Sequence, residues 1–212
     1  NSLRTNTTGC YNTALGFNSL CANTTASDNT AVGTCSLYAN TTGGNNVAMG
    51  SGSLCKNTTG GSNTAVGSGS LRDNTTGFNA VAIGNGALKF NTKGNTNIGI
   101  GRVTLLLNTT GANNVAIGNQ SMYLNTIGCE NVAVGAGALF YNTTGIKNMA
   151  VGANSLAKNT TGISNTAMGY QALRENTTAN SNVAVGYNTM IFNVTGTSNT
   201  AIGNNALFTN TT

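Results

Sequence analysis

The sequence predicts an all-β protein, a parallel β-solenoid (a β-roll or β-helix) of about twelve 17-residue coils, with residues 1–212 forming a single repeat array. Three observations predict this fold. An Asn recurs every 17 residues without insertion or deletion, a Gly recurs ten residues after each Asn from Asn6 to Asn193, and the period is too short for helix-pair repeats. With that Asn as position 1, the consensus is N-T-T-G-x-x-N-(T/V)-A-(V/I/M)-G-x-x-(S/A)-L-x-x.

Each part of the repeat has a composition that indicates its conformation. Gly at positions 4 and 11 is expected where the backbone needs positive φ or a close approach to another segment. Positions 7–11, as in residues 182–186, have the composition of a short strand. Positions 12–17, as in residues 170–175, suit either an irregular turn or a short turn of helix, and the sequence leaves both open.

The repeat alternates fixed positions with variable pairs. Position 10 is aliphatic or Met in every repeat, and position 15 is always Leu or Met. Positions 5–6, 12–13 and 16–17 accept charged, polar and aromatic residues. We therefore expect a coil with three corners. Its fixed residues, positions 10 and 15 included, should build the interior, while the variable pairs face solvent or a partner.

Coils must stack, because one repeat cannot fold alone. Ordering 17 residues costs roughly 17–34 kcal/mol of backbone entropy, whereas a coil offers few large side chains at about 1.5–3 kcal/mol each. At about 4.8 Å per coil, twelve coils would span roughly 58 Å. Neither end carries a capping sequence, so we expect a segment of a longer fibre or a unit that stacks end to end. Disorder is the alternative for an Asn-, Thr- and Gly-rich chain, but the apolar positions keep their phase throughout.

Composition argues against several function classes. The nine Lys and Arg residues are scattered, so no basic face for nucleic acid is expected, and no apolar run is long enough for membrane insertion. The chain has no His. Its carboxylates form two same-position pairs, Asp28 with Glu130 and Asp73 with Glu175, each six repeats apart, or about 29 Å. That is too far for paired-carboxylate catalysis. We expect no enzymatic activity, cofactor or metal.

The cysteines follow no regular ladder. Cys21 and Cys55 share position 16 but lie two repeats apart, about 9.6 Å, which is beyond disulfide reach. All five occupy variable positions, so none is expected in the core. The odd number leaves at least one thiol free or paired between chains. The five are Cys10, Cys21, Cys35, Cys55 and Cys129.

The Asn at position 1 opens an N-x-S/T sequon in most repeats. It is therefore either a column of stacked, hydrogen-bonded side chains or a row of N-glycan sites. Asn91 and Asn125 lie where the sequon is lost but the Asn is kept, which favours the column. Asn119 opens a further sequon outside the column. The sequon members of the column are Asn6, Asn23, Asn40, Asn57, Asn74, Asn108, Asn142, Asn159, Asn176, Asn193 and Asn210.

Thr at positions 2 and 3 raises the alternative of an ice-binding solenoid. That function needs alternating Thr-x-Thr, so that both hydroxyls share one face, whereas the adjacent Thr residues of this repeat point to opposite sides. Lys93 and Ile127 also interrupt the row at position 3.

Positions 16 and 17 carry an apolar stripe in the later repeats. Stripes of exposed apolar residues usually mark association, so we expect a side-by-side homo-oligomer here, with shielding of the coil as the alternative. The stripe consists of Phe90, Leu106, Leu107, Tyr123, Leu124, Phe140, Tyr141, Ile191, Phe192 and Phe208.

Residues 46–50, 80–84 and 182–186 resemble the N-S-V-A-I-G core of the head repeats of trimeric autotransporter adhesins. The longer unit, as in residues 165–173, is similar to the repeats of phage and giant-virus fibre proteins. The resemblance covers the whole chain and implies a parallel β-roll, usually trimeric, used as a stalk or receptor-binding head. The 17-residue period is longer than that of the adhesin head, so the coil cross-section is expected to differ.

These observations favour a structural fibre segment of an extracellular appendage, on a cell or virion surface, that assembles with itself as a trimer or filament. The alternative is an adhesin head whose variable positions contact a receptor or glycan.

Overall fold

The computed structural model describes residues 1–211, and its regular elements are twelve strands of three residues, one in each repeat. Gly follows every strand at position 11. The strands are β1 (Thr13–Leu15), β2 (Thr30–Val32), β3 (Val47–Met49), β4 (Thr64–Val66), β5 (Val81–Ile83), β6 (Ile98–Ile100), β7 (Val115–Ile117), β8 (Val132–Val134), β9 (Met149–Val151), β10 (Thr166–Met168), β11 (Val183–Val185) and β12 (Thr200–Ile202).

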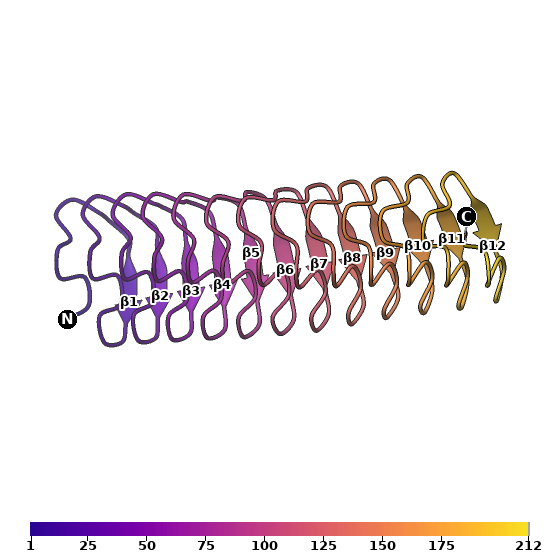
Figure 1. Ribbon diagram of the computed structural model, residues 1–212. Helices are drawn as coiled ribbons and strands as arrows, with labels where there is room; N and C mark the ends of the chain where they lie inside the picture. The colour runs from indigo at the N-terminus through magenta and orange to yellow at the C-terminus, as the bar shows by residue number, and fades with distance from the viewer. Residues whose placement is uncertain (212) are drawn as a thin grey trace. The chain divides into compact units, whose positions relative to one another are not determined.

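From β1 to β6, and again from β7 to β12, each strand pairs in parallel with the same position of the next repeat. In β2 and β3, for example, Ala31 lies opposite Ala48. The chain divides into two compact units, Asn1–Thr110 with β1–β6 and Gly111–Thr212 with β7–β12. Within each unit the strands follow one another in chain order, as Figure 1 shows. The predicted parallel β-solenoid is therefore confirmed.

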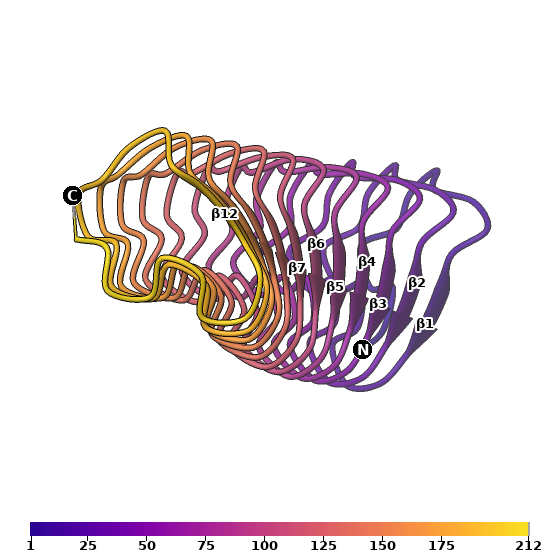
Figure 2. The same ribbon diagram turned by 90° about the vertical axis from the view of Figure 1, so that its right-hand side faces the viewer.

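Positions 12–17 form an irregular turn, so the helical turn that the sequence left open is absent from the described repeats. Positions 13 and 15 both have left-handed backbone conformations, as at Asn154 (φ 56°) and Leu156 (φ 47°). A right-handed helix cannot contain such residues. The turn instead continues each coil beyond the end of its strand (Figure 2).

The core of each coil is small and consists of two apolar columns. Position 15 supplies a Leu or Met, such as Leu139, and position 9 supplies an Ala, such as Ala133, and both are fully buried. A buried Ser, Ala or Thr at position 14 and buried Asn residues at positions 1 and 7 surround these columns through most of the array. The coil is too narrow for a second large side chain, which is why position 9 is Ala.

Position 10 points outward, and the prediction that it belongs to the interior is wrong. Six of these aliphatic or Met side chains are exposed, from Ile117 at 37% to Ile202 at 72%. The reason is the alternation of side chains along a strand. With Ala at the centre of a three-residue strand facing inward, positions 8 and 10 must both face outward.

Gly at position 11 combines the two features that the sequence suggested for it. Gly135 has φ 138°, and a Cβ at this site would lie 2.6 Å from the carbonyl carbon of Gly152 in the next coil. Both the conformation and the close stacking of the coils therefore require glycine. Gly at position 4 has no positive φ, and only close packing explains it.

Candidate functional surfaces

The Asn side chains of position 1 form a buried hydrogen-bonded ladder. The Nδ2 of Asn57 donates to Asn40 Oδ1 (2.8 Å) in the preceding coil and to the carbonyl of Gly60 (2.8 Å) in its own. The members from Asn23 to Asn193 are fully buried, while Asn6 is exposed and Asn210 half-buried. Both Nδ2 hydrogens of a typical member are thus used within the fold, at the atom where a glycan would attach. Thr212, the third residue of the Asn210 sequon, lies outside the described residues.

Position 7 forms a second Asn ladder, which the sequence analysis did not single out. Asn131 donates its backbone N–H to Asn114 Oδ1 (3.0 Å) and its Nδ2 to the carbonyl of Gly145 (2.8 Å). The two ladders meet there, because Asn142 Nδ2 donates to the same carbonyl (3.1 Å). The signal was present in the consensus, since Ala80 is the one interruption of the Asn at this position.

The two Thr rows have different environments. At position 2 the hydroxyl of Thr58 donates to the carbonyl of Thr75 in the next coil (3.0 Å), and its neighbour Thr59 at position 3 is exposed. The same contact recurs from Thr75 to Thr92. The row at position 3 is exposed, whereas most Thr residues of position 2 are half-buried with hydroxyls that donate to backbone carbonyls, so the two rows do not form the paired hydroxyl rows of an ice-binding face.

The apolar stripe at positions 16 and 17 is mostly half-buried. Leu106 is 9% exposed and Ile191 is 3% exposed, whereas Tyr141 and Phe192 are 47% and 39% exposed. The other stripe residues are half-buried, and several stack on one another, as Tyr123 does on Phe140 with ring centroids 5.1 Å apart. Most of the stripe thus covers the coils, Tyr141 and Phe192 are its exposed members, and association through it stays a prediction.

Cys21 is 3% exposed, so the expectation that no cysteine is buried is wrong. Position 16 lies against the neighbouring coils, which explains why Cys21, Leu106 and Ile191 are all covered there. All five cysteines are free thiols. The pKa of the Cys55 thiol is raised above its ordinary value, mainly by burial and to a smaller extent by the charge of the nearby Cys35 thiolate.

Two clusters of ion pairs tie neighbouring coils together. Asp73 accepts from Arg72 (2.7 Å) and from Lys56 of the preceding coil (3.0 Å). The same arrangement recurs six repeats later, where Glu175 accepts from Arg174 (2.7 Å) and Lys158 (2.6 Å).

Both carboxyl groups are held in their charged form. The hydrogen bond from Arg72 outweighs burial, and with Lys56 it lowers the pKa of Asp73. At Glu175 burial raises the pKa, but the combined hydrogen bonds and charges of Lys158 and Arg174 exceed this effect, so the net pKa is lowered. With lowered pKa values, these carboxylates are poorly suited to transfer protons at neutral pH.

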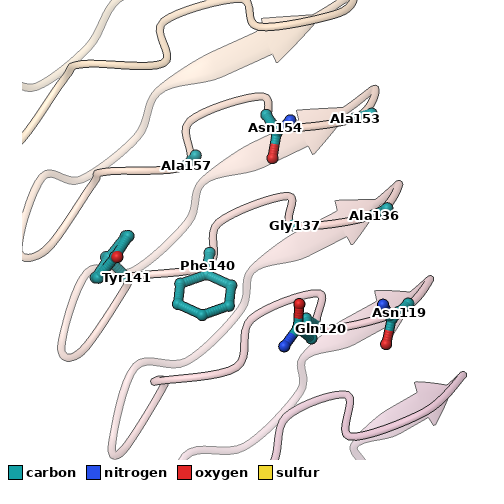
Figure 3. A pocket seen from close by; sticks show the side chains of 9 residues that line it. All are labelled: Asn119, Gln120, Ala136, Gly137, Phe140, Tyr141, Ala153, Asn154 and Ala157. Atoms are coloured by element: carbon teal, nitrogen blue, oxygen red, sulfur yellow. The ribbon is translucent and has the colours of Figure 1, made fainter.

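Two shallow grooves lie at positions 12, 13 and 16, and both occur where position 13 is Gly. The larger, about 350 Å³, lies over Gly137 (Figure 3). The smaller, about 230 Å³, lies over Gly52, Gly69 and Gly86. In most other repeats Asn, Gln, Val or Cys stands at position 13, and its side chain occupies the corresponding space.

The two grooves differ in charge. The groove over Gly137 is lined by Asn119, Gln120, Ala136, Gly137, Phe140, Tyr141, Ala153, Asn154 and Ala157, none of which is charged. The smaller groove contains Arg72 and Lys89, both of which lie against the ring of Phe90, at 5.4 Å from its centroid.

Comparison with protein-family models, curated proteins and solved structures finds no match to this chain. Over the described residues, no group of three or more His, Cys, Asp or Glu side chains is placed to hold a metal ion. The same part of the chain contains no helix with the length and hydropathy needed to cross a membrane.

Proposed function

We propose that the chain is a non-catalytic structural segment of a fibre, which assembles with further copies of itself through the outward face of its strands. The observation that carries this proposal is the strictly apolar character of position 10. Every repeat has an aliphatic residue or Met there, although the side chain points away from the core. Positions 5, 6, 12 and 13 vary freely, and the exposed Thr of position 3 is replaced by Lys93 and Ile127, whereas position 10 never accepts a polar residue. Folding of the single chain does not explain this restriction. Burial in an assembly does.

A second copy is the occupant that best fits this face. Positions 8 and 10 contain no charged residue in any repeat, and their columns offer only aliphatic, Met and Thr side chains. These columns repeat at the spacing of the coils, about 4.8 Å. Another solenoid of the same repeat has ridges at the same spacing, so contacts made by one coil recur at the next. Trimer and filament both remain predictions for the arrangement.

Replacing position 10 with Thr in three neighbouring strands tests this proposal. The variant Ile117→Thr/Val134→Thr/Val151→Thr keeps the inward Ala residues of β7–β9 intact, and position 8 already accepts Thr at Thr166. We expect the unmodified chain to associate in light scattering and to form elongated assemblies in electron micrographs. The variant should lose association with little change in its thermal unfolding.

The matched control is Thr144→Ser/Thr161→Ser, which alters two exposed residues of position 3. It should associate as the unmodified chain does. A chain that stays monomeric at high concentration, or a Thr variant that associates normally, would contradict the proposal.

The extracellular location, on a cell or virion surface, is proposed from the resemblance to adhesin and fibre repeats. A second candidate function is an adhesin head. It is supported by the groove over Gly137, which is built from the variable positions 12, 13, 16 and 17.

A further inference from the structure

The groove over Gly137 exists because three successive repeats carry the right combination of side chains. Gly137 has no side chain at position 13, and the small side chains of Ala136 and Ala153 at position 12 do not cover the groove. A Cβ on Gly137 would lie 2.6 Å from Asn154 Oδ1, so the amide of Asn154 reaches over the glycine. Figure 3 shows Asn154 and Gln120 on the coils either side of Gly137, with Phe140 and Tyr141 following it in its own coil.

One wall of this groove is aromatic. Phe140 stacks on Tyr123 with an angle of 3° between the rings, and the next residue of its column is Ala157. Since Ala157 has only a methyl group, no ring follows Phe140 on that side. Tyr141 tilts against Phe140 at 60° and is 47% exposed. The two rings therefore form a partly open aromatic corner.

The opposite wall is formed by side-chain amides. Those of Asn119, Gln120 and Asn154 make no hydrogen bond to any residue that the structure describes, although Asn119 and Asn154 use their backbone groups between coils. Each amide has two donor hydrogens and an acceptor oxygen. Lys158, which follows Ala157, is directed to Glu175 (2.6 Å), so its charge is already paired.

We propose that this groove binds an uncharged oligosaccharide. A sugar ring has one face of C–H groups, which packs on the electron-rich face of an aromatic ring, and hydroxyls that both donate to and accept from amides. The volume of about 350 Å³ is at the lower end of the range for small-molecule sites. A single-stranded nucleic acid would also stack on rings but needs cations for its phosphates, and no lining residue is charged.

This inference rests on the second candidate function and is independent of self-assembly. Its site is on positions 12, 13, 16 and 17, whereas the proposed assembly face is on positions 8 and 10.

The repeat itself supplies variants that should fold. Phe140→Ala places Ala at position 16, where Ala157 already stands, and Gly137→Asn places Asn at position 13, where Asn188 already has φ 53°. Gly137→Asn would fill the groove and displace only the flexible end of Asn154. The controls are Gly69→Asn in the smaller groove and Tyr170→Ala, which removes half of an exposed stacked pair of Tyr rings outside either groove.

The experiment titrates the full chain with maltotetraose, cellotetraose and chitotetraose. Calorimetry and saturation-transfer NMR measure the binding. We expect at least one sugar to bind with a Kd of about 1 mM or tighter. Phe140→Ala and Gly137→Asn should each weaken that binding about tenfold or more, while both controls stay within about twofold, a change of only ~0.4 kcal/mol. Circular dichroism melting curves should show that all four variants remain folded.

Absence of binding by all three sugars at about 10 mM, ten times the largest Kd expected, would overturn the proposal. Undiminished binding by folded Phe140→Ala and Gly137→Asn would overturn it too, as would loss of binding in Gly69→Asn or Tyr170→Ala. Light scattering on the same samples distinguishes failure of the oligosaccharide proposal from failure of the fibre proposal. Self-association should be unaffected by every variant in the groove.

Discussion

The side-chain amide of Asn142 shows how a polar residue can be fully buried in this solenoid. Its Nδ2 donates to Asn125 Oδ1 (2.8 Å) and to the carbonyl of Gly145 (3.1 Å), and its Oδ1 accepts from Asn159 Nδ2 (2.9 Å). Each amide is thus donor to one coil and acceptor from the next. Such a column satisfies buried polar atoms while it holds the coils in register.

We predict that Asn142→Ala lowers the free energy of unfolding by about 3 kcal/mol. Asn125 Oδ1 and Asn159 Nδ2 would each lose a partner, at about 1–3 kcal/mol for an unsatisfied buried group. Thr144→Ala, at an exposed site of the same repeat, should stay within about 0.5 kcal/mol. Urea unfolding followed by circular dichroism measures both, and equal midpoints would argue against a stabilising ladder.

Leu at position 15 combines a disfavoured conformation with complete burial. Leu139 has φ 50° and no exposed surface. The left-handed region costs a non-glycine residue about 1–2 kcal/mol, whereas burial of a Leu side chain contributes about 1.5–3 kcal/mol. The balance favours Leu here because the turn has no other position from which a long side chain can reach the centre of the coil.

At the scale of elements, each strand makes its backbone hydrogen bonds with stacked neighbours and not within its own coil. Three residues are too few for an isolated strand to persist. Parallel pairing with identical positions above and below supplies the backbone hydrogen bonds, as from Val47 N–H to the carbonyl of Asn63 (2.8 Å). Ion pairs across coils add to this at two places along the chain.

We predict an acid-dependent loss of the stability contributed by Asp73. Its pKa is lowered in the folded state, so its contribution is present above the unfolded pKa of about 3.9 and is lost as pH falls through the folded value. Because Lys56 is 63% exposed, the effect should be below about 1 kcal/mol.

Thermal unfolding of the unmodified chain and of Asp73→Asn between pH 6 and pH 2 measures this contribution. The variant should be the less stable protein at pH 6, and the difference should disappear at the acid end. Asp28→Asn, at an exposed carboxylate, is the control. A difference between Asp73→Asn and the unmodified chain that does not change with pH would contradict the assignment.

At the scale of the molecule, the repeat divides its surface by position. Positions 8 and 10 are apolar or Thr and uncharged in every coil, and positions 12, 13, 16 and 17 differ from coil to coil. The first pattern suits contacts that recur along the whole array, and the second suits a local site. Assembly and ligand binding can therefore occupy separate faces.

We predict that N-glycans, in a host that adds them, are found on exposed sequons and not on the buried ladder. Asn119 is exposed, whereas Asn57 and Asn142 are fully buried with both Nδ2 hydrogens bonded. Peptide mapping of the folded, secreted chain by mass spectrometry measures occupancy at each sequon. Glycan on folded chain at Asn142 would contradict the ladder, while an unmodified Asn119 would leave the ladder in place.

The sequence alone determined the parallel solenoid, because an uninterrupted 17-residue period with Gly and Leu in phase has few other solutions. It also indicated the Asn column, since Asn91 and Asn125 persist where the sequon does not. Only the tertiary structure decided which way position 10 points, because strand alternation cannot be phased until one inward residue is known. It likewise decided that Leu at position 15 lies in a left-handed turn, and that the absence of a side chain at Gly137 opens a groove. Both depend on contacts between coils, which a single repeat does not contain.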